Sequence, residues 1–498
     1  MSLFICLLIR IDMRNSTSQE HAHSHSQNRH AVLPTPLRLG VDGDYSARGV
    51  TIAFLDSGFY PHPDLTEPMN RIVAFKDISR PGAQLNTSTK PETWDWHGTM
   101  TAVSAAGNGF LSDGLYRGLA SEASVVLVKV SDEGKISEQN IERGLRWVIQ
   151  NKERYDIRVV SISLGGDREV SYKDNAVDQA AEEAVRAGIA VVAAAGNSGC
   201  TNRHQTVPPA NAPSVITVGG YNDNNTIGGT LDLYCSSYGE TPDGIVKPEL
   251  LAPAMWVAAP ILPRTEEYSR AEALSQIASS PDYLIGEITD ELWRHASLPP
   301  ALRSADLETI RAEVNRLLEE NKIIATHYQH VDGTSFAAPV IASLITRMIE
   351  ANTLLTPAAL KHILISTANR IVGADVSRQG YGVVNARRAL EEAKREQHFD
   401  EQQFACPPRV VGDYLEFVFH DDSALSVSLV GDFNRWDTRD VGFVRDESGV
   451  WRTRIESPVA GRYQYKLVVD ESRWIEDPAN LMKAPDGFGG YNSVLHIT

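Results

Sequence analysis

A chain of 498 residues is too long for one compact hydrophobic core, so we expect two or three domains. Its 47 Lys and Arg residues against 64 Asp and Glu residues give a formal net charge of −17, which argues against nucleic acid or an anionic membrane surface as a partner. No stretch approaches the roughly 20 consecutive apolar residues that a membrane-spanning helix requires, so we expect no membrane association.

The first 34 residues are polar and helix-poor, which predicts a disordered N-terminal arm over 1–34. The short apolar run "LFICLLI" at 3–9 has no preceding basic region and no small-residue cleavage site. We therefore expect a cytoplasmic protein. The alternative is secretion, with residues 1–12 acting as a weak signal.

The cysteines are few, and no two of them have the C-x-x-C spacing that is typical of zinc sites and of redox-active dithiols. This usage favours reduced thiols over a disulfide framework or a zinc site. The residues concerned are Cys6, Cys200, Cys235 and Cys406.

From Val50 onward, short apolar runs alternate with longer amphipathic stretches. Continuous runs rich in Val, Ile and Ala are typical of strands that are covered on both faces in a parallel sheet. The stretches between them predict helices, as in "SEQNIERGLRWVIQNK", where Ile141, Leu145 and Val148 share one face. The alternation predicts an α/β domain with helices on both faces of the sheet, over 35–396. The predicted strands are "VTIAFLD", "ASVVLVKV", "IRVVSISLG", "GIAVVAAAG" and "SVITVGG".

A different pattern begins near Gln397. After a linker at 397–408, alternating strands and turn residues recur every 8–12 positions over 409–498. This spacing predicts an all-β, immunoglobulin-like sandwich.

Four polar residues stand where a parallel sheet gathers functional groups, at the carboxyl ends of its strands. Asp56 ends "TIAFLD" and Asn197 follows "AVVAAAG", while His97 in "WDWHGT" and Ser335 in "DGTSFAAPV" stand at the starts of helices. Each residue alone is more simply a cap or turn residue. Together, in the order Asp, His, Asn, Ser, they favour catalysis by a serine nucleophile.

Five blocks of this chain resemble the signature blocks of the subtilisin-like serine proteases, in the order found in that family. The resemblance covers about 50–395 and implies a subtilisin-like parallel sheet and an endopeptidase acting on protein or peptide substrates. The blocks are Asp56-Ser57-Gly58, His97-Gly98-Thr99, Ser163-Leu164-Gly165, Ala195-Gly196-Asn197 and Gly333-Thr334-Ser335-Phe336-Ala337-Ala338-Pro339.

The resemblance implies a role for each catalytic residue. Ser335 is the nucleophile, His97 the general base and Asp56 its orienting partner, while Asn197 donates to the oxyanion. It also implies a specificity pocket that prefers small or medium apolar side chains, because Val207 stands where relatives often have glycine. The implied substrate-binding residues are Ser163, Leu164, Gly165, Ala195, Gly196 and Val207.

Two departures from the family concern metal and maturation. Relatives often keep a calcium-binding loop after the histidine helix, but "AAGNGFLSDG" does not match it, so we assign no metal and no cofactor. Structural calcium stays possible without support from a matching loop. Only 49 residues precede Val50, too few for the folded inhibitor segment of secreted relatives, which favours an intracellular branch.

Residues 260–330 form a charged, helical insertion immediately upstream of Ser335. In "DLETIRAEVNRLL" we expect Asp306 as the N-cap and an apolar stripe that needs a surface to cover. The insertion is either a lid over the catalytic cleft or an ornament packed away from it. The predicted stripe is Leu307, Ile310, Val314 and Leu317.

The segments "SLVGDFNRWD", "GRYQYKLVVDESRWIEDP" and "GGYNSVLHIT" resemble the glycogen- and starch-binding modules of the AMP-activated kinase β subunit and of isoamylases. The resemblance implies that an α-glucan is a partner and that it targets or regulates the protease. Two alternatives stay open: a silent protease fold acting as a glucan-binding scaffold, and an active protease whose β module is only structural. The implied sugar-binding residues are Trp436, Lys466, Trp474 and Asn492.

Overall fold

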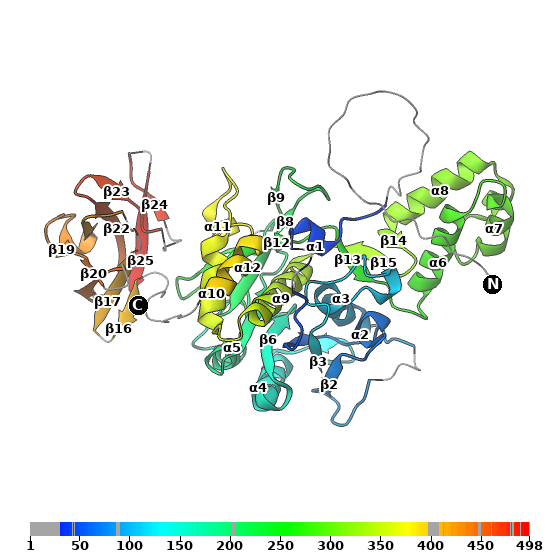
Figure 1. Ribbon diagram of the computed structural model, residues 1–498, viewed down its shortest axis with the longest axis horizontal. Helices are drawn as coiled ribbons and strands as arrows, with labels where there is room; N and C mark the ends of the chain where they lie inside the picture. The colour runs from blue at the N-terminus through cyan, green and yellow to red at the C-terminus, as the bar shows by residue number, and fades with distance from the viewer. Residues whose placement is uncertain are drawn as a thin grey trace.

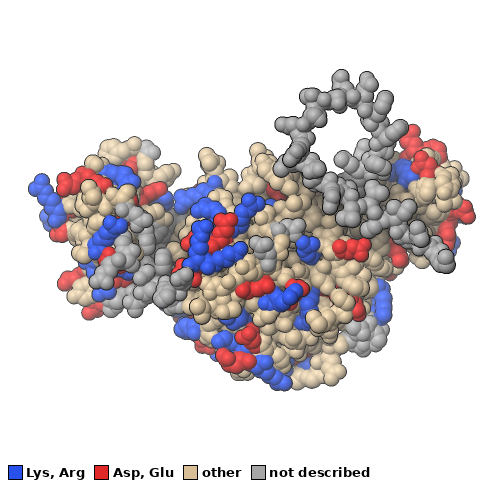
Figure 2. Space-filling view, in the orientation of Figure 1, with Lys and Arg blue, Asp and Glu red and all other residues tan. Residues whose placement is uncertain are grey.

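The computed structural model describes residues 30–498 except 42, 44, 86–89, 167, 202–204, 397–407, 412, 420, 422, 447–449, 460, 479, 481–482, 489 and 498. Figure 1 shows an α/β domain in the middle, a group of β-strands at one end and a group of helices at the other. None of the described helices is both long and apolar enough to cross a membrane. Acidic and basic side chains are intermixed on the face seen in Figure 2.

The α/β domain is built on one sheet with the spatial order β12-β8-β7-β6-β1-β3-β2, and β9 pairs with β8 at its side. All neighbours along the main path are parallel, and only the β8–β9 pair is antiparallel. The predicted parallel sheet is therefore confirmed, and its five predicted strands are neighbours at its centre. The strands are β1 (Thr51–Asp56), β2 (Ile72–Asp77), β3 (Ser124–Lys129), β6 (Ile157–Ile162), β7 (Ala190–Ala194), β8 (Ile216–Asn222), β9 (Asp232–Leu233) and β12 (Leu250–Pro253).

Helices cover both faces of the sheet, as predicted. Along β1 the side chains alternate, so that Ile52 and Phe54 join one apolar core while Ala53 and Leu55 join the other. The first core is completed by α3 (Asp95–Ala106), α9 (Thr334–Ala351), α10 (Pro357–Thr367) and α12 (Ala386–Arg395). The second is completed by α4 (Glu138–Tyr155) and α5 (Ala176–Arg186).

Short elements complete this domain, and some of them pack the chain ahead of β1. Residues 30–34 are not a free arm, because Val32 is buried beside Tyr116 and Tyr328. The prediction of disorder is thus wrong for these residues, and the rest of the arm lies outside the described residues. The short elements are α1 (Thr35–Arg38), α2 (Pro63–Thr66), α11 (Val376–Gln379), the 3-10 turn η1 (Phe110–Ser112), and the pairs β4 (Ser131–Asp132) with β5 (Lys135–Ile136) and β10 (Gly239–Glu240) with β11 (Val246–Lys247).

The predicted insertion is helical in its middle and ends in strands. Strand β13 (Val257–Pro260) pairs with β15 (Tyr328–Val331), and β15 pairs with β14 (Ile323–Ala325), so a small sheet forms the stem of the insertion. The helices beyond the stem are α6 (Glu266–Ser279), α7 (Ile285–Leu292), the 3-10 helix η2 (Pro300–Ser304) and α8 (Leu307–Glu320).

The surface covered by α8 differs from the prediction. Its N-cap is Asp306 as predicted, with the carboxylate accepting from the Thr309 N–H at 2.8 Å. Ile310 and Val314 are buried, but the third buried residue is Leu318, whereas Leu307 is exposed and Leu317 half-buried. The buried residues pack with α6 and α7 in a core of the insertion's own. The stripe therefore covers a surface inside the insertion and not one on the catalytic domain, and the choice between lid and ornament stays a prediction.

The C-terminal strands form the predicted sandwich, with one antiparallel sheet of order β16-β17-β21-β20 and another of order β19-β18-β22-β25-β24. Strand β23 pairs with β22 beside the second sheet. The core between the sheets holds Leu415 and Phe417 from the first and Leu429, Tyr465 and Leu467 from the second. The strands are β16 (Arg409–Val411), β17 (Tyr414–Phe419), β18 (Val427–Gly431), β19 (Val441–Gly442), β20 (Val444–Arg445), β21 (Trp451–Glu456), β22 (Gly461–Val469), β23 (Arg473–Ile475), β24 (Lys483–Pro485) and β25 (Tyr491–Ile497).

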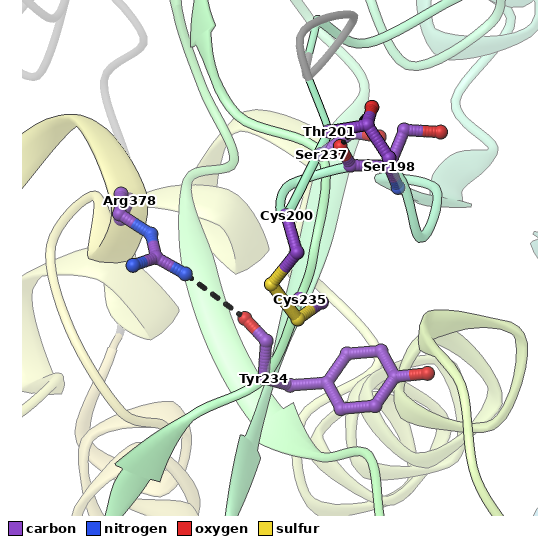
Figure 3. The surroundings of a disulfide bond; sticks show 7 residues. All are labelled: Ser198, Cys200, Thr201, Tyr234, Cys235, Ser237 and Arg378. Atoms are coloured by element: carbon purple, nitrogen blue, oxygen red, sulfur yellow. Dashed lines mark hydrogen bonds between the residues drawn. A yellow bond between two sulfur atoms is a disulfide. The ribbon is translucent and has the colours of Figure 1, made fainter.

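The expectation of reduced thiols is wrong for two of the four cysteines. Cys200 and Cys235 form a disulfide, with their Cα atoms 5.3 Å apart (Figure 3). The sequence did not reveal this pairing because the two residues meet only through the fold, where the Gly199 N–H donates to the Cys235 carbonyl at 3.0 Å. Cys6 and Cys406 lie outside the described residues.

Disulfides persist in oxidising compartments and are rare in the cytoplasm. The Cys200–Cys235 pair therefore supports the secreted alternative, although localisation stays a prediction.

We expect that replacing both cysteines, Cys200→Ser with Cys235→Ser, lowers the free energy of unfolding by about 2–4 kcal/mol. The crosslink joins residues 35 positions apart, and its loss frees the unfolded chain between them. Denaturant unfolding would be measured on the wild type and the double variant, both carrying Ser335→Ala to prevent self-digestion, with and without a dithiol. The dithiol should destabilise only the protein that keeps both cysteines. A double variant as stable as that protein with its disulfide intact would contradict the expectation.

Candidate active site

His97 and Asp56 are joined by a buried hydrogen bond at the carboxyl end of β1. His97 Nδ1 lies 2.7 Å from Asp56 Oδ1, and the side chains are 22% and 2% exposed, respectively. Burial would lower the pKa of His97, but the Asp56 charge and hydrogen bond outweigh it, so the pKa of His97 is raised. The Asp56 carboxylate also accepts from the Ser57 N–H at 2.7 Å and the Thr101 hydroxyl at 3.3 Å.

Two glycines allow β1 and α3 to approach closely enough for this contact. A Cβ on Gly98, the residue after His97, would lie 2.2 Å from the Gly58 carbonyl oxygen and 2.8 Å from Asp56 Cβ. A Cβ on Gly58 would lie 2.5 Å from Asp95 Oδ1. No side chain fits at either position without moving backbone, so the glycines in these blocks have a direct steric cause.

Ser335 stands in the first turn of α9, directly before a residue whose ring lies near His97. The following ring, Phe336, has its centroid 5.9 Å from that of His97 and packs with Met100 behind the site. In this conformation the Ser335 hydroxyl donates to the Ser163 carbonyl at 3.3 Å. The Ser163 hydroxyl donates in return to the Ser335 carbonyl at 2.7 Å, which ties the start of α9 to the end of β6.

Asn197 is oriented by Thr334, a positioning residue that the sequence interpretation did not single out. The Asn197 side-chain oxygen accepts from the Thr334 N–H at 3.0 Å and from the Thr334 hydroxyl at 3.1 Å. An amide whose oxygen is occupied presents its NH₂ group on the other side. Asn197 is exposed, so this NH₂ group is available to a bound molecule.

The predicted specificity residues lie around the same edge. A Cβ on Gly165 would lie 3.0 Å from Val207 Cγ2, so Val207 packs against the segment that follows β6. Ala195 is buried, and Gly196 has a φ of +98° and donates its N–H to the Thr334 hydroxyl at 3.1 Å. Leu164 is half-buried and packs against the second core.

Three of the four predicted sugar-binding residues lie on the second sheet of the sandwich, and Trp436 lies in the loop between β18 and β19. Lys466 is two residues along β22 from Val468, which pairs with Trp474, so Lys466 and Trp474 share a face. Asn492 Nδ2 donates to Gln464 Oε1 at 3.0 Å, and Gln464 precedes Lys466 by two residues on that face. Trp474 is 46% exposed, whereas Trp436 is half-buried.

Acidic side chains that the sequence interpretation missed hold this face in position. Asp432 accepts from the Trp436 indole N–H at 3.1 Å and from the Gln464 backbone N–H at 2.6 Å. Asp486 pairs with the Lys466 ammonium at 2.7 Å. The aspartate in "GDFNRWD" was visible in the sequence, but its link to β22 depends on pairing between distant strands.

A cluster of metal-ligating side chains does not emerge from the described part of the chain. No three His, Cys, Asp or Glu side chains gather there in a way that could hold a metal ion.

Comparisons with known proteins can now be set beside this geometry. Residues 47–382 match the model of the Subtilase family, and residues 408–479 match Carbohydrate-binding module 48 (Isoamylase N-terminal domain). Serine protease AprX of Bacillus subtilis (strain 168) is 32% identical over 354 residues, covering 69% of this chain and 67% of AprX. Subtilisin NAT of Bacillus subtilis subsp. natto is 34% identical over 202 residues, covering 38% of this chain and 47% of that protein. The structure of prenylagaramide maturation protease PagA has a TM-score of 0.46 and 18% identity, covering 72% of this chain and 99% of that chain.

The first family match falls on the α/β domain, where the blocks around Asp56, His97, Asn197 and Ser335 meet at one edge of the sheet. The second falls on the β-sandwich. This chain therefore belongs to the subtilase family of serine proteases and carries a carbohydrate-binding module 48 that follows its protease domain.

Proposed function

We propose that this protein is a serine endopeptidase in which Ser335 is the nucleophile, His97 the general base and Asp56 the residue that orients His97. The observation that carries the proposal is the 2.7 Å hydrogen bond between His97 Nδ1 and the buried Asp56 carboxylate, beside the start of α9. A free serine hydroxyl is a weak nucleophile and needs such a base.

The reaction then proceeds in two steps. The Ser335 hydroxyl turns from the Ser163 carbonyl towards His97 Nε2, which takes its proton as Oγ attacks the scissile carbonyl carbon. The C–N bond breaks as His97 gives that proton to the leaving amine, and an ester remains on Ser335. Water, deprotonated by His97, attacks the ester carbon; the bond between that carbon and Ser335 Oγ then breaks, His97 returns the proton to Oγ, and the new carboxyl end of the peptide leaves.

We propose that the negative charge formed on the carbonyl oxygen is bound by two donors. One is the Asn197 NH₂ group, whose orientation by Thr334 is fixed before substrate binds. The other is the Ser335 backbone N–H at the start of α9, where the helix dipole also favours negative charge.

The specificity pocket is proposed to lie between the segments 163–166 and 195–197. Contact between Val207 and Gly165 supports a pocket that is shortened by the valine side chain. Such a pocket would favour small or medium apolar side chains immediately before the scissile bond, because a larger ring would overlap Val207.

For the sandwich we propose that Trp436, Lys466, Trp474 and Asn492 bind an α-glucan such as glycogen. Flat aromatic faces suit the apolar faces of pyranose rings, and the ammonium and amide groups can donate to sugar hydroxyls. The exposed Trp474 and the shared face of Lys466 and Asn492 support this reading over a purely structural module. Likewise, the complete set of Asp56, His97, Asn197 and Ser335 argues against a silent protease fold.

We expect Ser335→Ala to abolish peptidase activity on casein and labelling by a fluorophosphonate, because no other group supplies the nucleophile. Asn197→Ala should lower kcat by about 10²–10³-fold, the general figure for loss of this donor in a subtilisin. Ser366→Ala, an exposed serine on α10, is the matched control and should keep full activity. Full activity in a folded Ser335→Ala variant would end the proposal.

The pH dependence of kcat/KM should have an acid limb whose midpoint lies above 6.5, the ordinary pKa of imidazole. His97 must be neutral to act as a base, and its raised pKa means that activity is lost at a higher pH as the solution is acidified. Asp56→Asn removes the cause of the raised pKa, so its residual activity should show an acid limb at lower pH. A wild-type midpoint below 6.5 would contradict this assignment.

Glucan binding should fall at least ten-fold in Trp474→Ala and in Trp436→Ala, since each removes a stacking face. Affinity for glycogen would be measured with the full chain carrying Ser335→Ala. Tyr414→Ala is the matched control, because Tyr414 is 47% exposed on β17 of the opposite sheet. Unchanged binding in both tryptophan variants would favour the alternative of a structural module.

A further inference from the structure

Trp96 is a large apolar side chain left open beside the proposed general base. All eight tryptophans lie in the described residues, and only Trp96 and Trp474 among them are exposed, at 48% and 46%. The Trp96 and His97 rings meet edge to face, with centroids 5.3 Å apart. A single exposed apolar side chain is common on a protein surface, so the exposure of Trp96 matters because of its position beside the proposed general base.

The neighbouring tryptophan has a structural explanation that Trp96 lacks. Trp94 is half-buried, lies against Gly134 of the β4–β5 hairpin and has the Lys129 ammonium 5.7 Å from its ring centroid. The Trp94 backbone carbonyl also accepts a hydrogen bond from the Ser57 hydroxyl at 2.9 Å. Among the described residues, by contrast, the indole N–H of Trp96 donates to no hydrogen-bond acceptor, and its ring contact is the one with His97.

The position of Trp96 places it where a bound peptide must pass. His97 has to reach both the Ser335 hydroxyl and the leaving nitrogen, so the residues flanking the scissile bond lie against the imidazole. The imidazole is bounded by Phe336 at 5.9 Å, which is buried, and by Trp96 at 5.3 Å, which is exposed. A substrate side chain that extends from His97 along the exposed surface on the Trp96 side therefore meets the Trp96 ring.

We propose that Trp96 forms the wall of a subsite for an apolar side chain next to the scissile bond, distinct from the pocket that Val207 shortens. This inference rests on the proposed function, because it requires a peptide bound for attack by Ser335. The contact is present in the bound substrate as well as in the transition state, so Trp96 acts mainly on KM.

The test is cleavage of two peptide series by the full chain and by Trp96→Ala. One series varies the residue two places before the scissile bond, and the other varies the residue directly after it. In one series the variant should lose a preference for large apolar side chains by about ten-fold in kcat/KM, mainly through KM. Trp96→Phe should keep most of that preference, and the preference before the scissile bond attributed to Val207 should not change.

Phe110→Ala is the matched control, because Phe110 is 46% exposed but follows the far end of α3, which lies about 14 Å along the helix from His97. An equal loss on all peptides in Trp96→Ala, or a shifted acid limb of kcat/KM, would mean that Trp96 only positions His97 and would overturn the subsite. Unchanged preferences in both series would overturn it as well. Failure of the proposed function is a separate result, since it would appear as activity in Ser335→Ala.

Discussion

The buried hydrogen bond between Asp56 and His97 is the constraint around which the protease domain is arranged. A carboxylate that is 2% exposed is unfavourable unless donors surround it, and Asp56 has His97, the Ser57 N–H and the Thr101 hydroxyl. These donors come from the end of β1 and the first turns of α3, so strand and helix must nearly touch. Gly58 and Gly98 make that approach possible, because a Cβ at either position would overlap its neighbours.

Ser335, the proposed nucleophile, is held at the same edge of the sheet by a second set of contacts. Thr334 binds Asn197, and Ser163 exchanges hydrogen bonds with Ser335, so α9 is tied to the ends of β6 and β7. The insertion leaves this arrangement intact although it enters the chain just upstream. Its helices bury their apolar faces against one another, and its stem returns through β15 to Gly333, whose N–H donates to the Ala254 carbonyl at 2.7 Å. The helices of the insertion thus pack mainly against one another, while its stem packs against the protease domain.

How much the sequence predicts depends on whether a feature is local. The central strands and α4 follow from uninterrupted apolar runs and 3.6-residue periodicity, and the blocks around Asp56, His97 and Ser335 point to one sheet edge because each ends a strand or starts a helix. The Cys200–Cys235 pair and the hold of Thr334 on Asn197 depend on contacts between distant segments. Periodicity also misassigned the stripe of α8, where burial of Leu318 in place of Leu307 reflects packing on α6 and α7.

The two candidate sites share a physical design, although one is proposed to cut peptides and the other to bind sugar. In each, an exposed tryptophan lies beside a polar group that is already fixed by a hydrogen bond within the protein: Trp96 beside His97, and Trp474 on the face that carries Lys466. In the sandwich, Asp486 holds the Lys466 ammonium through one of its three donors, which leaves the other two for the proposed glucan. Fixing these groups in advance reduces the conformational entropy lost on binding. The same reasoning applies to the proposed oxyanion site near Ser335, where Thr334 fixes the Asn197 amide in advance, so that no reorganisation is needed when charge develops on the carbonyl oxygen.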